Sequence, residues 1–180
     1  QLEVIQVGDF RKNEIIRDLM LLLAQRLGSK LDFQKISKEL GISRPRLHEY
    51  LAFLEGTFFI KTIRPYTKGR NSEIRKRPKV YLCDTGLANH LARLDQGILF
   101  ENCVFQSLRQ KGEINYYEKK SGVEIDFILN KKQAFEAKLT PQQRDMNQLK
   151  KISEELNLER FQVISKNYTE LENTIYGFML

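Results

Sequence analysis

Apolar residues at the start of the chain recur at helical spacing. In residues 12–27 they fall at every third or fourth position, and Gly28 is expected to end this helix. A second, shorter helix is predicted at 33–40, where Asp32 precedes the apolar positions and is suited to cap the first turn. The pattern therefore predicts two amphipathic helices at the start of the chain.

A third helix and two strand-like runs follow. Ser43 is a natural N-cap for a helix at 44–55, and the short turn before it is typical of a helix-turn-helix. Apolar, β-branched and aromatic residues then dominate 58–66 and 79–84, with a polar, glycine-containing turn at 68–77 between them. Three helices followed by such a hairpin predict an N-terminal winged helix-turn-helix, with the basic turn as its wing.

A domain boundary is expected near residue 97, where Asp95, Gln96 and Gly97 read as a loop. It divides the chain into domains at 1–97 and 98–180. The elements predicted in the second domain are a helix at 99–110, a strand at 114–120, two strands within 122–139, a helix begun by Pro141 and a capping box of Thr140 and Gln143, and a strand at 160–165. This order predicts a mixed sheet flanked by helices, so the expected fold class is α+β.

Charged side chains interrupt the apolar pattern of the hairpin within 122–139. Period-two alternation places Glu136 and Lys138 on one side of their strand, and the turn brings Asp126 near Glu136. Two such carboxylates suit Mg²⁺, which takes one or two protein carboxylates and keeps several waters. Lys138 would orient a nucleophile or neutralise charge on a phosphoryl group, and Glu101 could add a carboxylate from the preceding helix. The hairpin is therefore a candidate catalytic site, with Asp126 and Glu136 as metal ligands.

The net charge of +7 is concentrated in one segment. Residues 61–79 hold eight basic residues and one acid, and such a patch attracts polyanions, above all nucleic acid. Basic residues on the non-core side of the third helix extend this surface. The candidate DNA-binding residues are Arg44, Arg46, His48, Lys68, Arg70, Arg75, Lys76 and Arg77. A solvated basic loop is the alternative interpretation of the charge run.

Composition argues against several other classes. The longest apolar run near the N-terminus, residues 19–24, is too short to span a bilayer, and the first residues do not resemble a signal peptide. The two cysteines are distant in sequence from each other and from both histidines, which argues against a disulfide framework and a zinc site. No membrane contact is expected, and a reducing cytoplasmic location fits best.

The succession of Glu101, Asp126 and Glu136-Ala137-Lys138 resembles the PD-(D/E)xK nuclease-like superfamily. The resemblance implies a restriction-endonuclease-like α/β domain, in which the Asp and Glu bind the metal and the Lys assists the attacking water. The sequence departs from the superfamily pattern at one point, because Ile125 rather than a proline precedes Asp126.

Longer segments carry a second resemblance. The stretches LGISRPRLHEYLAFLEGTFFIKTIRPY, KVYLCDTGLANHL, FENCVFQSL and GVEIDFIL resemble the C-terminal region of a large prokaryotic group of AAA-type ATPases. Those proteins carry an N-terminal P-loop ATPase domain, a winged helix and a nuclease-like domain of unknown function. This chain begins with Gln and contains no GxxxxGK[ST] motif, so ATP is expected only in a missing N-terminal domain. The resemblance implies DNA and the protein's own ATPase domain as partners.

Two functions remain open from the sequence. In the first, the winged helix docks DNA and the second domain performs Mg²⁺-dependent phosphodiester hydrolysis. In the second, the chain is a non-catalytic module that couples the ATPase domain to DNA or to a protein partner. The charged hairpin is then a salt-bridged cluster left from a nuclease ancestor. Binding of a divalent metal ion distinguishes the two hypotheses.

Overall fold

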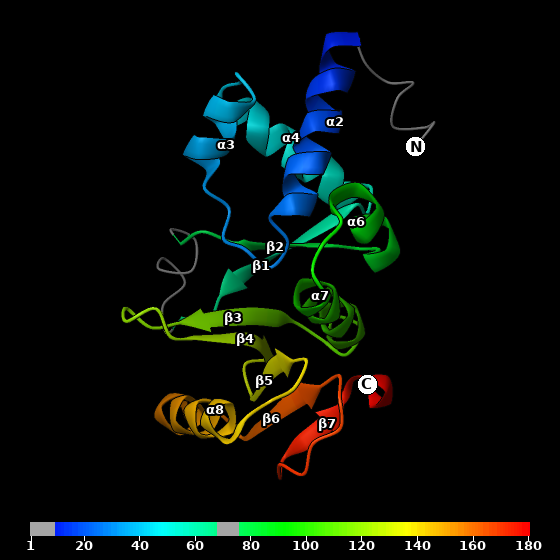
Figure 1. The fold of residues 1–180 in the computed structure, drawn as a ribbon. Coiled ribbons are helices and arrows are strands. Elements are labelled where there is room, and N and C mark those ends of the chain that lie inside the picture. The colour runs from blue at the N-terminus through cyan, green and yellow to red at the C-terminus, as the bar shows by residue number, and fades with distance from the viewer. Residues whose placement is uncertain (1–9, 68–75) are drawn as a thin grey trace.

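A computed structural model describes residues 10–67 and 76–180, without the side chains of residues 10–12. These residues form an α+β fold with a mixed sheet of seven strands in the order β2-β1-β3-β4-β5-β6-β7 (Figure 1). The helices are α2 (Phe10–Gln25), α3 (Phe33–Glu39), α4 (Arg44–Gly56), α6 (Thr85–Ala92), α7 (Gln96–Leu108) and α8 (Gln143–Leu156). The strands are β1 (Ile60–Pro65), β2 (Lys79–Leu82), β3 (Ile114–Glu118), β4 (Glu124–Leu129), β5 (Gln133–Lys138), β6 (Arg160–Ser165) and β7 (Thr174–Tyr176), followed by the short 3₁₀ helix η1 (Gly177–Met179). None of the helices in the described part of the chain is long and apolar enough to cross a membrane.

The three helices of the first half form where the sequence predicts them. α2 begins and ends two residues before the predicted range of 12–27. The Asp32 side chain accepts hydrogen bonds from two backbone N–H groups in the first turn of α3, and Ser43 Oγ accepts one from the backbone of Arg46. The buried face of α4 consists of Leu47, Tyr50, Leu51 and Leu54. Both predicted caps are therefore confirmed.

β1 and β2 form the antiparallel pair expected from the sequence, with Ile60 opposite Leu82. β1 also pairs in parallel with β3, where Arg64 lies opposite Asn115. The sequence did not predict this second pairing. It joins the strand pair of the first half to the five strands of the second half, so that one sheet runs through the chain (Figure 1). The connecting turn, interpreted above as a wing, lies outside the described residues at 68–75.

From α7 onward, the elements follow the predicted order of helix, three strands, helix and strand, with β7 as an additional strand. The sheet separates two hydrophobic layers. Phe105 of α7 packs in the larger core together with Phe127, whereas Leu149 of α8 packs in the smaller core together with Ile128. Because Phe127 and Ile128 are adjacent in β4, they point to opposite faces, and α7 and α8 cover those two faces.

Two local predictions are wrong. The expected loop at 95–97 lies two residues earlier, at 93–95, because Gln96 is the first residue of α7 and Asp95 Oδ1 caps the helix by accepting from the backbone of Ile98 at 3.0 Å. α8 does not begin at Pro141 with a capping box of Thr140 and Gln143. It begins at Gln143, and its capping box is formed by Gln142 and Asp145. In both places an aspartate carboxylate accepts the backbone N–H, and a carboxylate is a stronger acceptor than a hydroxyl or an amide.

The larger hydrophobic core draws on both halves of the chain. It joins Leu23 of α2, Leu47 of α4 and Tyr81 of β2 with Phe105 and Phe127. The Tyr81 ring stacks on Phe105 at a centroid distance of 4.4 Å and lies 5.5 Å from Phe127. The division into domains at 1–97 and 98–180 stays a prediction, and a cut at that point would pass through this shared core.

Candidate active site

A tight turn between β4 and β5 sets the register of the hairpin that carries the predicted catalytic residues. Asn130 and Lys131 have positive φ angles of 52° and 61°, a conformation that asparagine adopts more readily than most residues. Asn130 Oδ1 also accepts the backbone N–H of Glu113 at 2.9 Å. Phe127 pairs with Phe135 across the two strands. The next residues of the two strands, in the direction away from the turn, are Asp126 and Glu136.

β4 is irregular next to Asp126. The register between β3 and β4 shifts by one residue between Asn115 and Tyr117, so that β4 holds one extra residue, as in a β-bulge. Ile125 packs in the smaller core and Phe127 in the larger one, although residues two apart in a regular strand share a face. The bulge therefore sets the direction of Asp126, which lies between them.

Hydrogen bonds link Asp126 to the charged residues of β5. The backbone N–H of Ala137 donates to Asp126 Oδ2 at 2.9 Å, and the backbone N–H of Asp126 donates to Glu136 Oε2 at 3.3 Å. Lys138 Nζ lies 2.7 Å from Glu136 Oε1. The structure thus brings together the three hairpin residues that the sequence singled out.

Glu101 reaches the same region from α7. Tyr81 OH donates to Glu101 Oε1 at 2.7 Å, and Gly28 passes so close that a Cβ there would lie 2.9 Å from the same oxygen. Burial, followed by the negative charge of Asp126, raises the pKa of Glu101 to about 7. The negative charge of Asp126 therefore disfavours ionisation of Glu101, as expected for two neighbouring carboxylates.

Glu136 has a similar electrostatic environment. Only 8% of the residue is exposed, and burial, followed by the charge of Asp126, raises the pKa of Glu136 to about 7. Burial would lower the pKa of Lys138, but Glu136 and Asp126 hold that pKa above its ordinary value. The site therefore contains three carboxylates whose mutual repulsion favours an added positive charge.

Sequence reasoning missed the buried lysine of this region. The Lys79 side chain is 5% exposed, and its Nζ lies 2.9 Å from Glu124 Oε2, while Lys30 Nζ lies 2.9 Å from Glu124 Oε1. Burial lowers the pKa of Lys79, but Asp126, Glu101 and Glu124 raise it above its ordinary value. In the sequence, Lys79 stands out only as one member of the basic stretch at 61–79. Its position at the start of an otherwise apolar strand was the available signal, because a lysine is buried only with a partner.

The carboxylates provide hard oxygen donors for Mg²⁺ but do not form a complete set of protein ligands. Among residues 10–67 and 76–180, no group of three or more His, Cys, Asp or Glu side chains lies close enough to hold a metal ion. Asp126 and Glu136, the predicted ligands, are nevertheless neighbouring hard oxygen donors. Mg²⁺ commonly takes one or two carboxylates and completes its octahedral shell with water. The pair therefore suits a largely hydrated Mg²⁺ and does not form a full protein cage.

Part of the predicted DNA-binding set forms a basic face beside the first turns of α3 and α4. Arg77 Nη2 lies 3.0 Å from Asp32 Oδ2, and Arg44 Nη2 donates to Gln34 Oε1 at 3.0 Å. The backbone N–H of Lys35 lowers the pKa of Asp32, and the charges of Arg77 and Arg44 lower it further. The residues at the base of the expected wing therefore lie beside the start of α3.

The other predicted DNA-binding residues differ in their contacts and exposure. Arg46 Nε donates to Tyr50 OH at 3.0 Å, and the exposed His48 has its ring centroid 4.7 Å from that of Phe33. Lys76 is exposed. Three predicted residues lie outside the described part of the chain: Lys68, Arg70 and Arg75.

A groove of about 580 Å³ continues the basic surface from the first half to the second. Tyr66 and Lys76 line it from the first half, and Tyr117, Lys119 and Lys120 line it from the second. The groove therefore extends from the base of the expected wing to the turn between β3 and β4. Asp126 lies further along β4.

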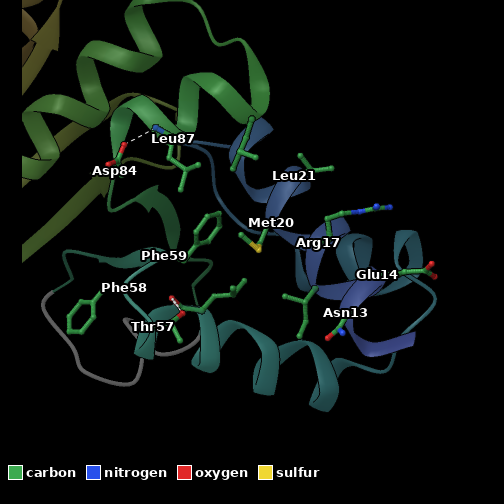
Figure 2. A pocket seen from close by; sticks show the side chains of 13 residues that line it. Asn13, Glu14, Arg17, Met20, Leu21, Thr57, Phe58, Phe59, Asp84 and Leu87 are labelled. Atoms are coloured by element: carbon green, nitrogen blue, oxygen red, sulfur yellow. Dashed lines mark hydrogen bonds between the residues drawn. The ribbon is translucent and has the colours of Figure 1, made fainter. Parts of the chain in front are cut away.

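An apolar pocket of about 530 Å³ lies elsewhere, between α2, the end of α4 and the start of α6. Figure 2 shows Met20 and Phe59 facing one another across this pocket, while Glu14 and Arg17 extend away from it. Its lining includes none of the predicted catalytic or DNA-binding residues. The pocket is therefore separate from the candidate active site.

Comparison with known proteins gives two family matches. Residues 1–97 match the family described as Domain of unknown function (DUF8612), and residues 96–176 match Domain of unknown function (DUF4143). The second is a domain found at the C-termini of AAA-ATPase-associated proteins. No curated protein and no solved structure matches the chain. Because the first match covers more than half of the 180 residues, the chain belongs to the DUF8612 family, with a DUF4143 domain following in its second half.

Proposed function

We propose that the chain is the DNA-binding and nuclease-like part of an AAA-type ATPase. In this proposal a winged helix contacts DNA, and a PD-(D/E)xK-like site hydrolyses phosphodiester bonds with Mg²⁺. The main observation in its favour is that Asp126, Glu136 and Lys138 lie together in the β4–β5 hairpin. Glu101 is close enough for the charges of Asp126 and Lys138 to shift its pKa. The DUF4143 match supports the association with an ATPase.

Each residue of the hairpin has a role in this proposal. Asp126 and Glu136 would hold the metal ion, which supplies an acidified water and positive charge at the phosphoryl group when bound. Lys138, paired to Glu136 at 2.7 Å, is placed to orient the attacking water or to neutralise charge that develops on the phosphate. Glu101, with a pKa of about 7, can hold or release a proton near neutral pH. The water oxygen gives up a proton to a neighbouring base and bonds to phosphorus as the ester P–O bond breaks, and the leaving oxygen takes up a proton, so that the overall change is the addition of one water.

The basic face supports DNA as the substrate. Arg77 and Arg44 contact Asp32 and Gln34 at the first turn of α3. The groove that continues into the second half is lined by Lys76, Lys119 and Lys120 together with one acid, Glu118, and Lys119 also pairs with Glu155. Contacts from such basic side chains go to phosphates and position a duplex without reading its sequence. We therefore assign docking of the DNA backbone to this face.

A cleavage assay on linear and circular DNA, with Mg²⁺ or Mn²⁺, tests the proposal. We expect Asp126→Asn to lose cleavage together with metal binding, and Lys138→Ala to lose cleavage while it still binds metal. The double variant Lys150→Ala with Lys151→Ala removes two exposed charges from α8 and is the matched control. Absence of cleavage by the chain, both alone and joined to its ATPase domain, would contradict the proposal.

A non-catalytic coupling module is the second candidate. It is favoured by the internal partners of the carboxylates, since Tyr81 donates to Glu101 and Lys138 pairs with Glu136. A cluster neutralised in this way can serve as a joint between elements. Under this second candidate, Mg²⁺ and Mn²⁺ leave the stability of the protein unchanged, and Asp126→Asn destabilises it.

A further inference from the structure

We propose that Lys79 is a positioning residue of the carboxylate site, which holds Asp126 and Glu101 together from strand β2. The inference deepens the proposed function and rests on it for its consequence in catalysis. It assigns to the first half of the chain a residue that the site in the second half requires.

The first observation is the burial of Lys79 together with its partners. Its side chain is 5% exposed, its Nζ lies 2.9 Å from Glu124 Oε2, and the same atom lies 5.4 Å from the centre of the Tyr116 ring. Glu124 is two residues from Asp126 in β4. Although β1 and β3 lie between β2 and β4 in the sheet order, the Lys79 ammonium therefore reaches past β1 and over Tyr116 of β3 to the strand that carries Asp126.

The second observation is a pair of contacts from one strand. β2 presents Lys79 to β4, and two residues later it presents Tyr81, whose hydroxyl donates to Glu101 Oε1 at 2.7 Å. Residues two apart in a strand share a face. One face of β2 therefore supplies a cation to Glu124 of β4, two residues from Asp126, and a phenol to Glu101 of α7.

The third observation is the charge balance of the site. Glu101, Asp126 and Glu136 carry three carboxylates, and Lys138 forms its ion pair with Glu136 while its charge also acts on Asp126 and Glu101. The charges of Asp126 and Glu101 both act on Lys79. Without Lys79, these two carboxylates would face each other with no nearby cation from β2, and their separation would increase.

Lys30 provides a matched control within the same ion network. Its Nζ pairs with Glu124 and with Glu118, and it is half-buried, but Asp126 and Glu101 are not among the charges that shift its pKa. Lys30→Met therefore removes a cation from the network without removing one from the carboxylate site.

A double-mutant cycle on the full, metal-free chain tests the inference. We expect Lys79→Met to destabilise the protein and Asp126→Asn to restore part of the loss, with roughly tenfold non-additivity in the unfolding equilibrium constant. Lys30→Met and Asp126→Asn should be additive within about twofold. If Lys79→Met does not fold, the same cycle is measured with Glu124→Gln in every variant, which removes the carboxylate that loses Lys79 as a partner. Additive effects of Lys79→Met and Asp126→Asn would overturn the inference.

Kinetics distinguish this inference from the proposed function. If the wild-type chain cleaves DNA, Lys79→Met should lower kcat about tenfold or more with KM for DNA unchanged, whereas Lys30→Met should leave kcat within about twofold. An unchanged kcat in Lys79→Met would overturn the positioning role. Non-additivity in the cycle without any DNA cleavage would instead support the role of Lys79 and contradict the nuclease.

Discussion

At the residue scale, Glu101 and Glu136 are expected to give the stability of the protein an unusual dependence on pH. Both pKa values are raised from an ordinary 4.5 to about 7, so the folded protein binds more protons than the unfolded chain between these values. The free energy of unfolding should therefore fall as the pH rises from about 4.5 to about 7, and level off above that range. Each carboxylate taken alone accounts for a loss on the order of 3 kcal/mol over this range.

Urea unfolding at a series of pH values measures this effect. Glu101→Gln and Glu136→Gln should each flatten the slope between about pH 4.5 and 7. Glu159→Gln is the control, since the Glu159 side chain forms an exposed pair with Lys132. A slope that is identical in wild type and both site variants would contradict the assignment.

The response to metal ions is a second property of single residues. Mg²⁺ or Mn²⁺ should stabilise the wild type by about 2.7 kcal/mol at a hundredfold excess over its dissociation constant. Asp126→Asn should lose this gain, while its metal-free stability stays the same or rises slightly, because one of three repelling charges is removed. Melting temperatures of both proteins with and without metal check the prediction. An equal response in wild type and Asp126→Asn would remove Asp126 from the metal site.

Gly28 provides a third test at this scale. It has a φ of +70°, and a Cβ there would lie 2.9 Å from Glu101 Oε1, whereas Gly41 has a φ of +64° with no atom within 4 Å of such a Cβ. Gly28→Ala and Gly41→Ala should both lose about 1 kcal/mol from the left-handed backbone conformation. Only Gly28→Ala should also alter the pH slope assigned to Glu101. If both variants keep the wild-type slope, Glu101 tolerates the added methyl group without a change in environment.

At the scale of elements, the caps of α3 and α4 and the β4–β5 hairpin could be predicted from the sequence because their determinants are local. Asp32 and Ser43 act within one turn of their own helices, and the turn at Asn130 fixes which residues oppose one another. The bulge in β4 could not be predicted. Alternation alone would place Ile125 and Phe127 on one face, and the bulge arises from pairing with β3, which is a tertiary contact.

The same limit explains why Lys79 was missed. Its burial depends on the ion pair with Glu124, which lies 45 residues further along the chain. No pattern within β2 identifies that partner. The sequence could show only that a lysine stands in an apolar strand. The structure supplies the partner, and with it the connection between β2 and the carboxylate site.

The basic residues beside α3 and α4, together with Lys76 and Arg77 at the base of the expected wing, are expected to contribute to DNA binding. Lys76→Ala together with Arg77→Ala should weaken DNA binding and reduce the slope of log K against log salt by about two, because each phosphate contact contributes roughly 0.9. Fluorescence anisotropy at several salt concentrations measures both quantities. Lys150→Ala with Lys151→Ala carries the same change in charge on α8 and should leave the slope unchanged. Wild-type affinity in the first variant at low salt would remove the base of the wing from the interface.

At the scale of the whole molecule, the two family matches meet at residues 96–97, yet sheet and core continue across that point. Apolar periodicity shows that a side chain is buried but not which element buries it, so the sequence suggested two separate cores. β1 pairs with β3, and Tyr81 packs between Phe105 and Phe127. These contacts join the halves in the same region where Lys79 and Tyr81 reach the carboxylates.

A fragment of residues 98–180 therefore tests the fold as a whole. Without the first half, β3 loses its parallel partner β1, and Phe105 and Phe127 lose the ring of Tyr81. We expect this fragment to lack a cooperative unfolding transition, whereas the full chain should unfold in one transition that coincides by circular dichroism and tyrosine fluorescence. A fragment of residues 58–180 keeps β1 and β2 and should retain more structure than 98–180. A sharp, reversible transition in 98–180, together with two separate transitions in the full chain, would show that the halves fold independently. The carboxylate site would then be completed only when the two halves dock.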